Sequence, residues 1–64
     1  MKNEINDPII IDAVFVRETK DAILFDCEGD LEWFPKKHIN FDSENDELEV
    51  ERWILKQKFP KEKY

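Results

Sequence analysis

The chain is poor in the residues that build chemical sites: its 64 residues include one cysteine, one histidine and one glycine. Cys27 has no partner for an internal disulfide, and a free thiol is typical of a reducing, intracellular setting. One cysteine and one histidine are too few for a structural zinc site, and one glycine is too few for a phosphate-binding loop. The sequence therefore predicts no metal, no cofactor and no disulfide framework.

Long apolar segments are also missing. The longest runs, residues 9–11 and 13–16, are separated by Asp12 and fall far short of the ~20 residues of a membrane-spanning helix. Residues 1–4 show no signal-peptide pattern. We therefore expect a cytoplasmic protein that does not contact membranes.

Charge, in contrast, is abundant. Hydrophobic residues make up 41% of the chain and charged residues another 41%, with a net charge of −6. This mixture is typical of one folded domain with a solvated exterior, and a domain of this size buries only ~60% of its unfolded surface. A deep catalytic cleft would remove core that so small a domain needs, and negative charge repels nucleic-acid phosphate. A shallow protein-binding surface fits better.

The hydrophobic pattern predicts a mostly β fold. Residues 9–16 form a first strand that is apolar on both faces, so it is either central or bent across two layers. Residues 22–27 and 31–35 form a hairpin around Glu28-Gly29, which places Leu24 opposite Trp33 and Ile23 opposite Phe34. We expect Trp33 to be largely buried, so that Trp33→Ala costs about 3–5 kcal/mol.

The rest of the chain predicts shorter elements. After Pro35, residues 36–39 form a short turn that returns Ile39 to the core, and residues 40–46 form a polar loop. Residues 47–50 form a fourth, edge strand with Leu48 and Val50 facing inward, and a two-turn helix then ends at Pro60. The expected architecture is a small bent antiparallel sheet or SH3-like partial barrel with a C-terminal helix. It is one domain, residues 1–64, with a core at 9–58 and tails at 1–7 and 60–64.

One stretch combines several distinctive motifs, which are Ala22-Ile23-Leu24-Phe25-Asp26, Gly29, Trp33-Phe34-Pro35-Lys36-Lys37 and Ile39. On these motifs, about residues 9–58 resemble a family of short, largely uncharacterised proteins of bacteriophages and mobile elements. The resemblance implies a phage origin and a bacterial host cell rather than an activity. Lys37-His38 stands where the family commonly has serine-glutamine. The segment from Trp33 to Ile39 is also similar to the closing segment of SH3-like barrels, at the level of fold alone.

Enzymatic chemistry finds no support in the residues. Cys27 and His38 are the only nucleophile–base candidates, and the predicted hairpin places them at opposite ends of a strand. The acids of residues 26–30 lack the glycine position and the terminal glutamate of a calcium loop. We therefore predict a non-enzymatic protein.

The most informative stretch is acidic. Residues 40–51 contain no lysine or arginine, and the candidate partner-binding residues there and just beyond are Asp42, Glu44, Asp46, Glu47, Glu49, Glu51 and Trp53. They are interpreted either as a solvated loop and edge strand or as a phosphate-like surface that binds a basic groove on a protein partner. Charges along a strand repeat every ~6.6 Å, so mimicry of nucleic acid would need Asp12, Glu32 or the hairpin turn to complete it. A half-exposed tryptophan beside such a surface would be a hot spot.

Two rival hypotheses remain from the sequence. The first is a phage-type accessory protein that binds a host protein and modulates or inhibits it, for example a nucleic-acid-handling or defence component, as anti-CRISPR proteins do. The second is a small barrel that binds single-stranded nucleic acid through an aromatic and basic patch. The residues of that alternative patch are Trp33, Phe34, Lys36, Lys37 and His38. The lysines of residues 52–63 are either the solvated face of the helix or a basic end, and both hypotheses are compatible with a homo-oligomer.

Overall fold

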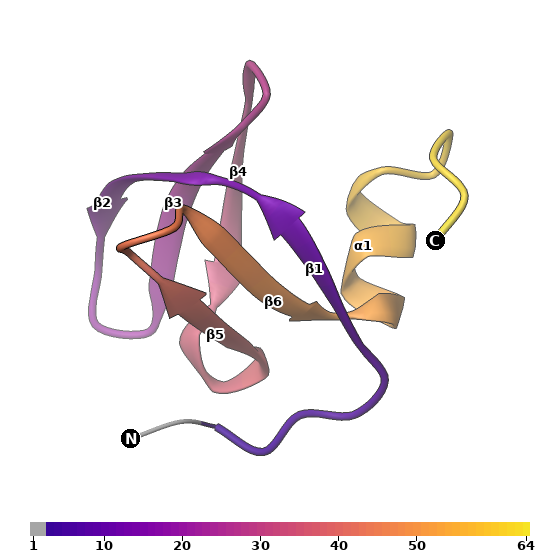
Figure 1. The fold of residues 1–64 in the computed structure, drawn as a ribbon, viewed down its shortest axis with the longest axis horizontal. Coiled ribbons are helices and arrows are strands. Elements are labelled where there is room, and N and C mark those ends of the chain that lie inside the picture. Colours follow the sequence, from indigo (N-terminus) through magenta and orange to yellow (C-terminus); the bar gives the residue numbers. More distant parts are fainter. Residues whose placement is uncertain (1–2) are drawn as a thin grey trace.

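In the computed structural model, which describes residues 3–64, the chain is mostly β with one short helix near the C-terminus (Figure 1). The elements in chain order are β1 (Pro8–Asp12), β2 (Val14–Glu18), β3 (Ala22–Cys27), β4 (Asp30–Pro35), the 3₁₀ turn η1 (Lys36–His38), β5 (Ile39–Asp42), β6 (Glu47–Glu51) and α1 (Arg52–Lys58). The predicted mostly-β class with a C-terminal helix is confirmed. The predicted tail at residues 1–7 includes Met1 and Lys2, which lie outside the described residues.

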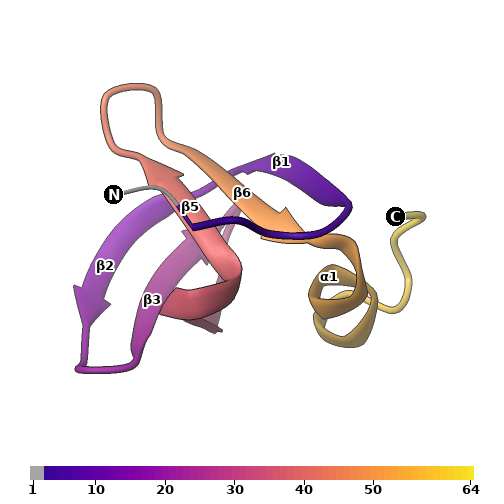
Figure 2. The same cartoon turned by 90° about the horizontal axis from the view of Figure 1, so that it is seen from below.

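The strands form two antiparallel sheets of three strands each. Their orders are β1-β6-β5 and β2-β3-β4, and within residues 3–64 the two sheets do not close into a barrel. Figure 2 shows the first strand passing from one sheet into the other, while α1 lies beside the end of β6. The bent antiparallel sheet predicted from sequence is therefore confirmed in the open form.

The bend of the first strand lies at Ala13, between β1 and β2. Ala13 is 2% exposed, and its backbone N–H donates to the carbonyl oxygen of Asp46 at 3.0 Å. Between Phe15 and Arg17 the pairing of β2 with β3 shifts register, as in a β-bulge, and such bulges increase strand twist. A small side chain at the corner and a bulge beyond it let one continuous segment serve both sheets.

The β3–β4 hairpin has the predicted register. Leu24 pairs with Trp33 and Ile23 with Phe34, as expected from a two-residue turn. Glu28 and Gly29 both have positive φ, 54° and 98°, which is the backbone conformation of a type I′ turn.

The core lies between the two sheets and under α1. Its fully buried side chains are Phe25, Phe34, Leu48, Leu55 and Val50. Phe25 is at the centre of an aromatic cluster, with ring centroids 6.4, 6.0 and 4.8 Å from those of Phe15, Phe34 and Phe41. Ile39 is also buried, so the 3₁₀ turn returns it to the core as predicted.

Two predictions about the acidic region are wrong. Residues 40–42 are not part of a polar loop, because they belong to β5, which pairs with β6. β6 lies between β1 and β5, so it is the central strand of its sheet rather than an edge. Both errors have one cause. Ile39 and Phe41 alternate with the polar Asn40 and Asp42, and this short strand pattern is easily mistaken for a loop. Without β5, β6 has no partner on that side and is predicted to be an edge strand.

The predicted burial of Trp33 is also wrong. Trp33 is 40% exposed and Trp53 is 50% exposed. The side chains of β4 alternate between faces, and the adjacent Phe34 takes the core position. Trp33 therefore lies on the outer face of the β2-β3-β4 sheet, although its register with Leu24 is as predicted.

Candidate functional site

The outer face of the β1-β6-β5 sheet carries a row of three acids, one from each strand. Asp12 pairs with Glu47, and Glu47 pairs with Asp42, so the three stand side by side across the sheet. All three side chains are exposed. Directly opposite side chains of an antiparallel pair have Cβ atoms about 4.5–5.5 Å apart, and like charges at that spacing are destabilising. We call Asp12, Glu47 and Asp42 the acidic row.

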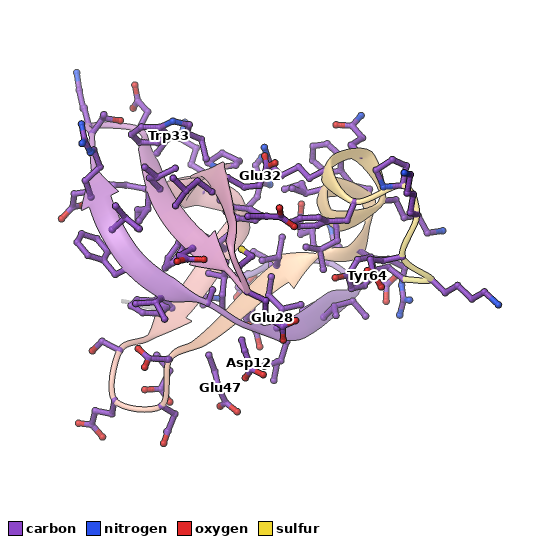
Figure 3. All side chains as sticks on the ribbon, turned by 90° about the horizontal axis from the view of Figure 1, so that it is seen from above. Asp12, Glu28, Glu32, Trp33, Glu47 and Tyr64 are labelled. Carbon is purple, nitrogen blue, oxygen red and sulfur yellow. The ribbon has the colours of Figure 1, made fainter. Side chains whose placement is uncertain are left out.

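Further acids surround the acidic row. A shallow hollow beside it is lined by Asp12 together with Asp26, Glu28 and Asp46. Figure 3 shows Asp12, Glu28 and Glu47 on the same side of the molecule. Residues of the hairpin turn and of the β5–β6 turn both line the hollow, and both turns contribute negative charge. Glu32, also considered from sequence as a contributor, instead lies 3.6 Å from the ammonium of Lys58.

Asp42 also shapes the turn that follows it. Its Oδ1 accepts the backbone N–H of Glu44 at 3.0 Å, and its Oδ2 accepts the side-chain amide of Asn45 at 2.8 Å. The hydrogen bond from the Asn45 side chain, followed by those from the backbone, holds the pKa of Asp42 below its ordinary value. This carboxylate is therefore charged at neutral pH.

The next row of the same face is more neutral. Glu49 pairs with Ile10 on one side and Asn40 on the other, and its Oε1 accepts a hydrogen bond from the Asn40 side-chain amide at 2.9 Å. Glu49 is half-buried, whereas Ile10 is 61% exposed. An apolar side chain thus lies beside the acids on the outer face.

Glu51 is buried, unlike the other predicted acids. Its carboxylate accepts hydrogen bonds from the backbone N–H of Asn6 at 2.9 Å, the indole N–H of Trp53 at 2.8 Å and Nδ1 of His38 at 2.9 Å. The Asn6 amide, then the Trp53 indole, lower the pKa of Glu51, against the opposing effect of burial. The predicted partner-binding residues are therefore divided. Asp42, Glu44, Asp46 and Glu47 are exposed near one turn, whereas Glu51 and Trp53 lie at the opposite end of β6.

The alternative patch is not brought together. Phe34 is fully buried, and the Lys36 ammonium lies 2.7 Å from a carboxylate oxygen of Glu18. His38 contacts Glu51 and also the Trp53 ring, whose centroid is 5.8 Å from its own. Lys37 is exposed, and Trp33 is on the outer face of β4. These residues do not form one continuous stacking surface.

The nucleophile–base pair considered from sequence is not brought together. Cys27 lies next to the hairpin turn, whereas His38 follows the far end of β4 and binds Glu51. In this part of the chain no group of three or more histidine, cysteine, aspartate or glutamate side chains is placed to hold a metal ion.

Cys27 should be chemically inert in the folded protein. The pKa of its thiol is raised to about 11, mainly by burial and to a smaller extent by the nearby carboxylates of Glu32 and Asp26. Only ~0.1% of the thiol is then ionised at pH 8, and the thiolate is the reactive form. We expect iodoacetamide to label Cys27 slowly in buffer and rapidly in urea, as followed by mass spectrometry, and Cys27→Ser to keep the fold. Equal labelling rates in both solutions would contradict this.

Sequence reasoning missed an exposed apolar face. On the outer side of the β2-β3-β4 sheet, Val14 is 54%, Leu31 59% and Trp33 40% exposed, and the half-buried Leu24 lies between the flanking strands. The signal was available, because residues 9–16 are apolar on both faces.

The described residues contain no helix with the length and apolar character needed to cross a membrane. Comparison of the chain with protein-family models, curated proteins and solved structures finds no match.

Proposed function

We propose that this chain is a non-enzymatic binding protein whose acidic row contacts a basic surface on a protein partner. The observation that carries the proposal is the alignment of Asp12, Glu47 and Asp42 across three adjacent strands. This arrangement opposes folding, because like charges directly opposite each other in a sheet repel. A basic partner would relieve that repulsion on binding.

The charges around the acidic row support the same proposal. Among residues 3–64 the ion pairs join Lys36 to Glu18, His38 to Glu51, Arg52 to Asp7 and Lys58 to Glu32. None of these pairs includes a member of the acidic row. Most basic residues come before residue 21 or after residue 51 in the sequence. The negative charge of the acidic row is therefore not neutralised by an ion pair within the described residues.

The charge spacing of the outer face is compatible with partners that normally bind nucleic acid. Neighbouring strands lie ~4.8 Å apart, and alternate residues along one strand are ~6.6 Å apart. A DNA strand carries one charge per ~3.4 Å of axis, and its successive phosphates are farther apart in space than this rise because the backbone winds around the axis. The acidic row and the acids beside it therefore present charges at spacings comparable to those of a phosphate backbone. Together with the resemblance to short phage proteins, this supports a phage-type accessory protein that inhibits or modulates a host nucleic-acid-handling or defence protein in the bacterial cytoplasm.

Charge reversal tests the proposal. The partner is first captured from host lysate on immobilised wild-type protein and identified by mass spectrometry, and its kinetics are then measured by surface plasmon resonance. Asp12→Lys with Glu47→Lys should weaken binding by about 100-fold, mainly through slower association, and added salt should weaken the wild-type complex.

The matched control is Asp21→Lys with Glu62→Lys, which makes the same change in net charge at exposed positions outside the acidic row. It should bind within about threefold of wild type. If both variants lose the same affinity for the partner, the effect comes from net charge rather than from the acidic row, and the proposal is wrong. Tight binding of a single-stranded oligonucleotide that is lost in Lys36→Glu with Lys37→Glu would favour the nucleic-acid alternative.

A further inference from the structure

β5 is an edge strand with backbone groups free to pair. Among residues 3–64 it is bonded to β6 on one side only. The carbonyl oxygen of Ile39 accepts the side-chain amide of Asn3 at 2.8 Å, so this carbonyl points away from β6. Because N–H and C=O directions alternate along a strand, those of Phe41 point to the same open side. An unpaired strand edge of this kind is a template for an added strand.

The space beside this edge is a groove of about 590 Å³. One side of the groove is apolar, formed by Ile23, Ile39 and Phe41, and the other includes the acids Asp42, Glu47 and Glu49. The apolar side belongs to the interior between the two sheets, and the acids belong to the outer face. The edge of β5 therefore separates two surfaces of opposite character.

We propose that an extended segment of the protein partner adds to the edge of β5 as a further strand, with apolar and basic residues in alternation. This inference rests on the proposed function and specifies the partner's chemistry. Successive side chains of a strand point to opposite faces. One set would therefore pack on Ile23 and Phe41, while the other set would lie beside Asp42 and Glu49. The free N–H and C=O of Phe41 would bond to the added backbone, as in other strand-addition complexes.

The charge of the chain and the position of Asn3 favour a strand from a different protein over the β5 strand of a second copy of this chain. Antiparallel pairing of two β5 edges would bring the acids of both copies together, on chains that each carry a net charge of −6. The backbone of Asn3 already exchanges hydrogen bonds with the Asn40 side chain, at 2.7 and 2.9 Å. A polypeptide thus docks at the Ile39 end of the edge, and no residue of the described part of the chain pairs with the stretch from Phe41 toward the turn, where the partner would bind.

Synthetic peptides separate strand addition from simple charge attraction. The probe is a capped octapeptide of alternating valine and lysine, and its control is a capped octapeptide with four lysines followed by four valines. Binding is measured by calorimetry and by NMR of the ¹⁵N-labelled protein. The alternating peptide should bind at least ~10-fold more tightly than the block peptide, and N-methylation of its valines should remove that advantage. The shifted amides should centre on β5, and hydrogen exchange at Phe41 should slow.

The outcomes distinguish the two proposals. If both peptides bind equally and Asp12→Lys with Glu47→Lys weakens both, the acidic row binds basic segments but strand addition is wrong. If neither peptide binds, strand addition is overturned, and the partner kinetics above decide the proposed function separately. If the alternating peptide still binds more tightly than the block peptide after N-methylation of its valines, backbone pairing at the β5 edge is likewise wrong.

Discussion

Phe34→Ala should lower the free energy of unfolding by about 3–5 kcal/mol, whereas Trp33→Ala should lower it far less. Phe34 is fully buried against Phe25, and truncation of a buried phenylalanine costs about 3–5 kcal/mol. A domain of this size has a free energy of unfolding of about 3–10 kcal/mol. Trp33 is 40% exposed on the other face of the same strand, so its loss should cost about 1–2 kcal/mol.

Urea denaturation followed by circular dichroism measures both variants against wild type. The pair is matched, because the two residues are neighbours on β4 and both are aromatic. A Trp33 variant that is as unstable as the Phe34 variant would mean that the outer face of the β2-β3-β4 sheet is covered in solution. A Phe34 variant that loses no more stability than the Trp33 variant would contradict the placement of the core.

Glu51→Gln should lower the melting temperature at pH 7 by more than about 4 °C, and the difference from wild type should shrink in acid. The Glu51 carboxylate joins Asn6 before β1, His38 in η1 and Trp53 in α1. These donors lower the pKa of Glu51 in the folded state. The stabilisation is therefore complete above the unfolded pKa, near 4.5, and is lost as pH falls through the lower folded pKa.

The measurement is thermal melting between pH 2.5 and 7. Glu62→Gln is the control, because Glu62 is exposed near the C-terminus and should leave the melting curve almost unchanged at every pH. A Glu51→Gln curve that runs parallel to wild type through the acid range would show that Glu51 is not a source of the acid sensitivity. Asp7 and Asp42, whose pKa values are also lowered, would then be the remaining contributors.

The parts of the fold that sequence predicts well are local. The β3–β4 register follows from the two-residue turn at Glu28-Gly29, since a short loop leaves few ways to align its strands. The inward positions of Leu48 and Val50 follow from simple alternation. The end of α1 at Lys58 is also local, because Pro60 cannot continue a helix.

Sequence reasoning fails where distant segments decide the outcome. Trp33 is aromatic and correctly aligned, but Phe25 and Phe34 from the opposite face occupy the interior. The acidic row depends on the pairing of β1 with β6, which joins Asp12 to Glu47 across most of the chain. No local spacing indicates that pairing. β5 went unrecognised because its four residues include two polar ones, and its pairing partner follows a turn rich in acids.

The corner at Ala13 also affects the order in which the protein can assemble during synthesis. β1 is synthesised before the other strands of the domain, whereas its partner β6 is synthesised after all of them. The β3–β4 hairpin needs only its own short turn and can close within microseconds. β2 can join that hairpin early, whereas β1 must wait with Ile9 and Ile11 exposed until residues 47–51 arrive. Because one continuous segment serves both sheets, the first strand of the domain to be synthesised is the last strand to be buried, and it stays accessible to chaperones and proteases the longest.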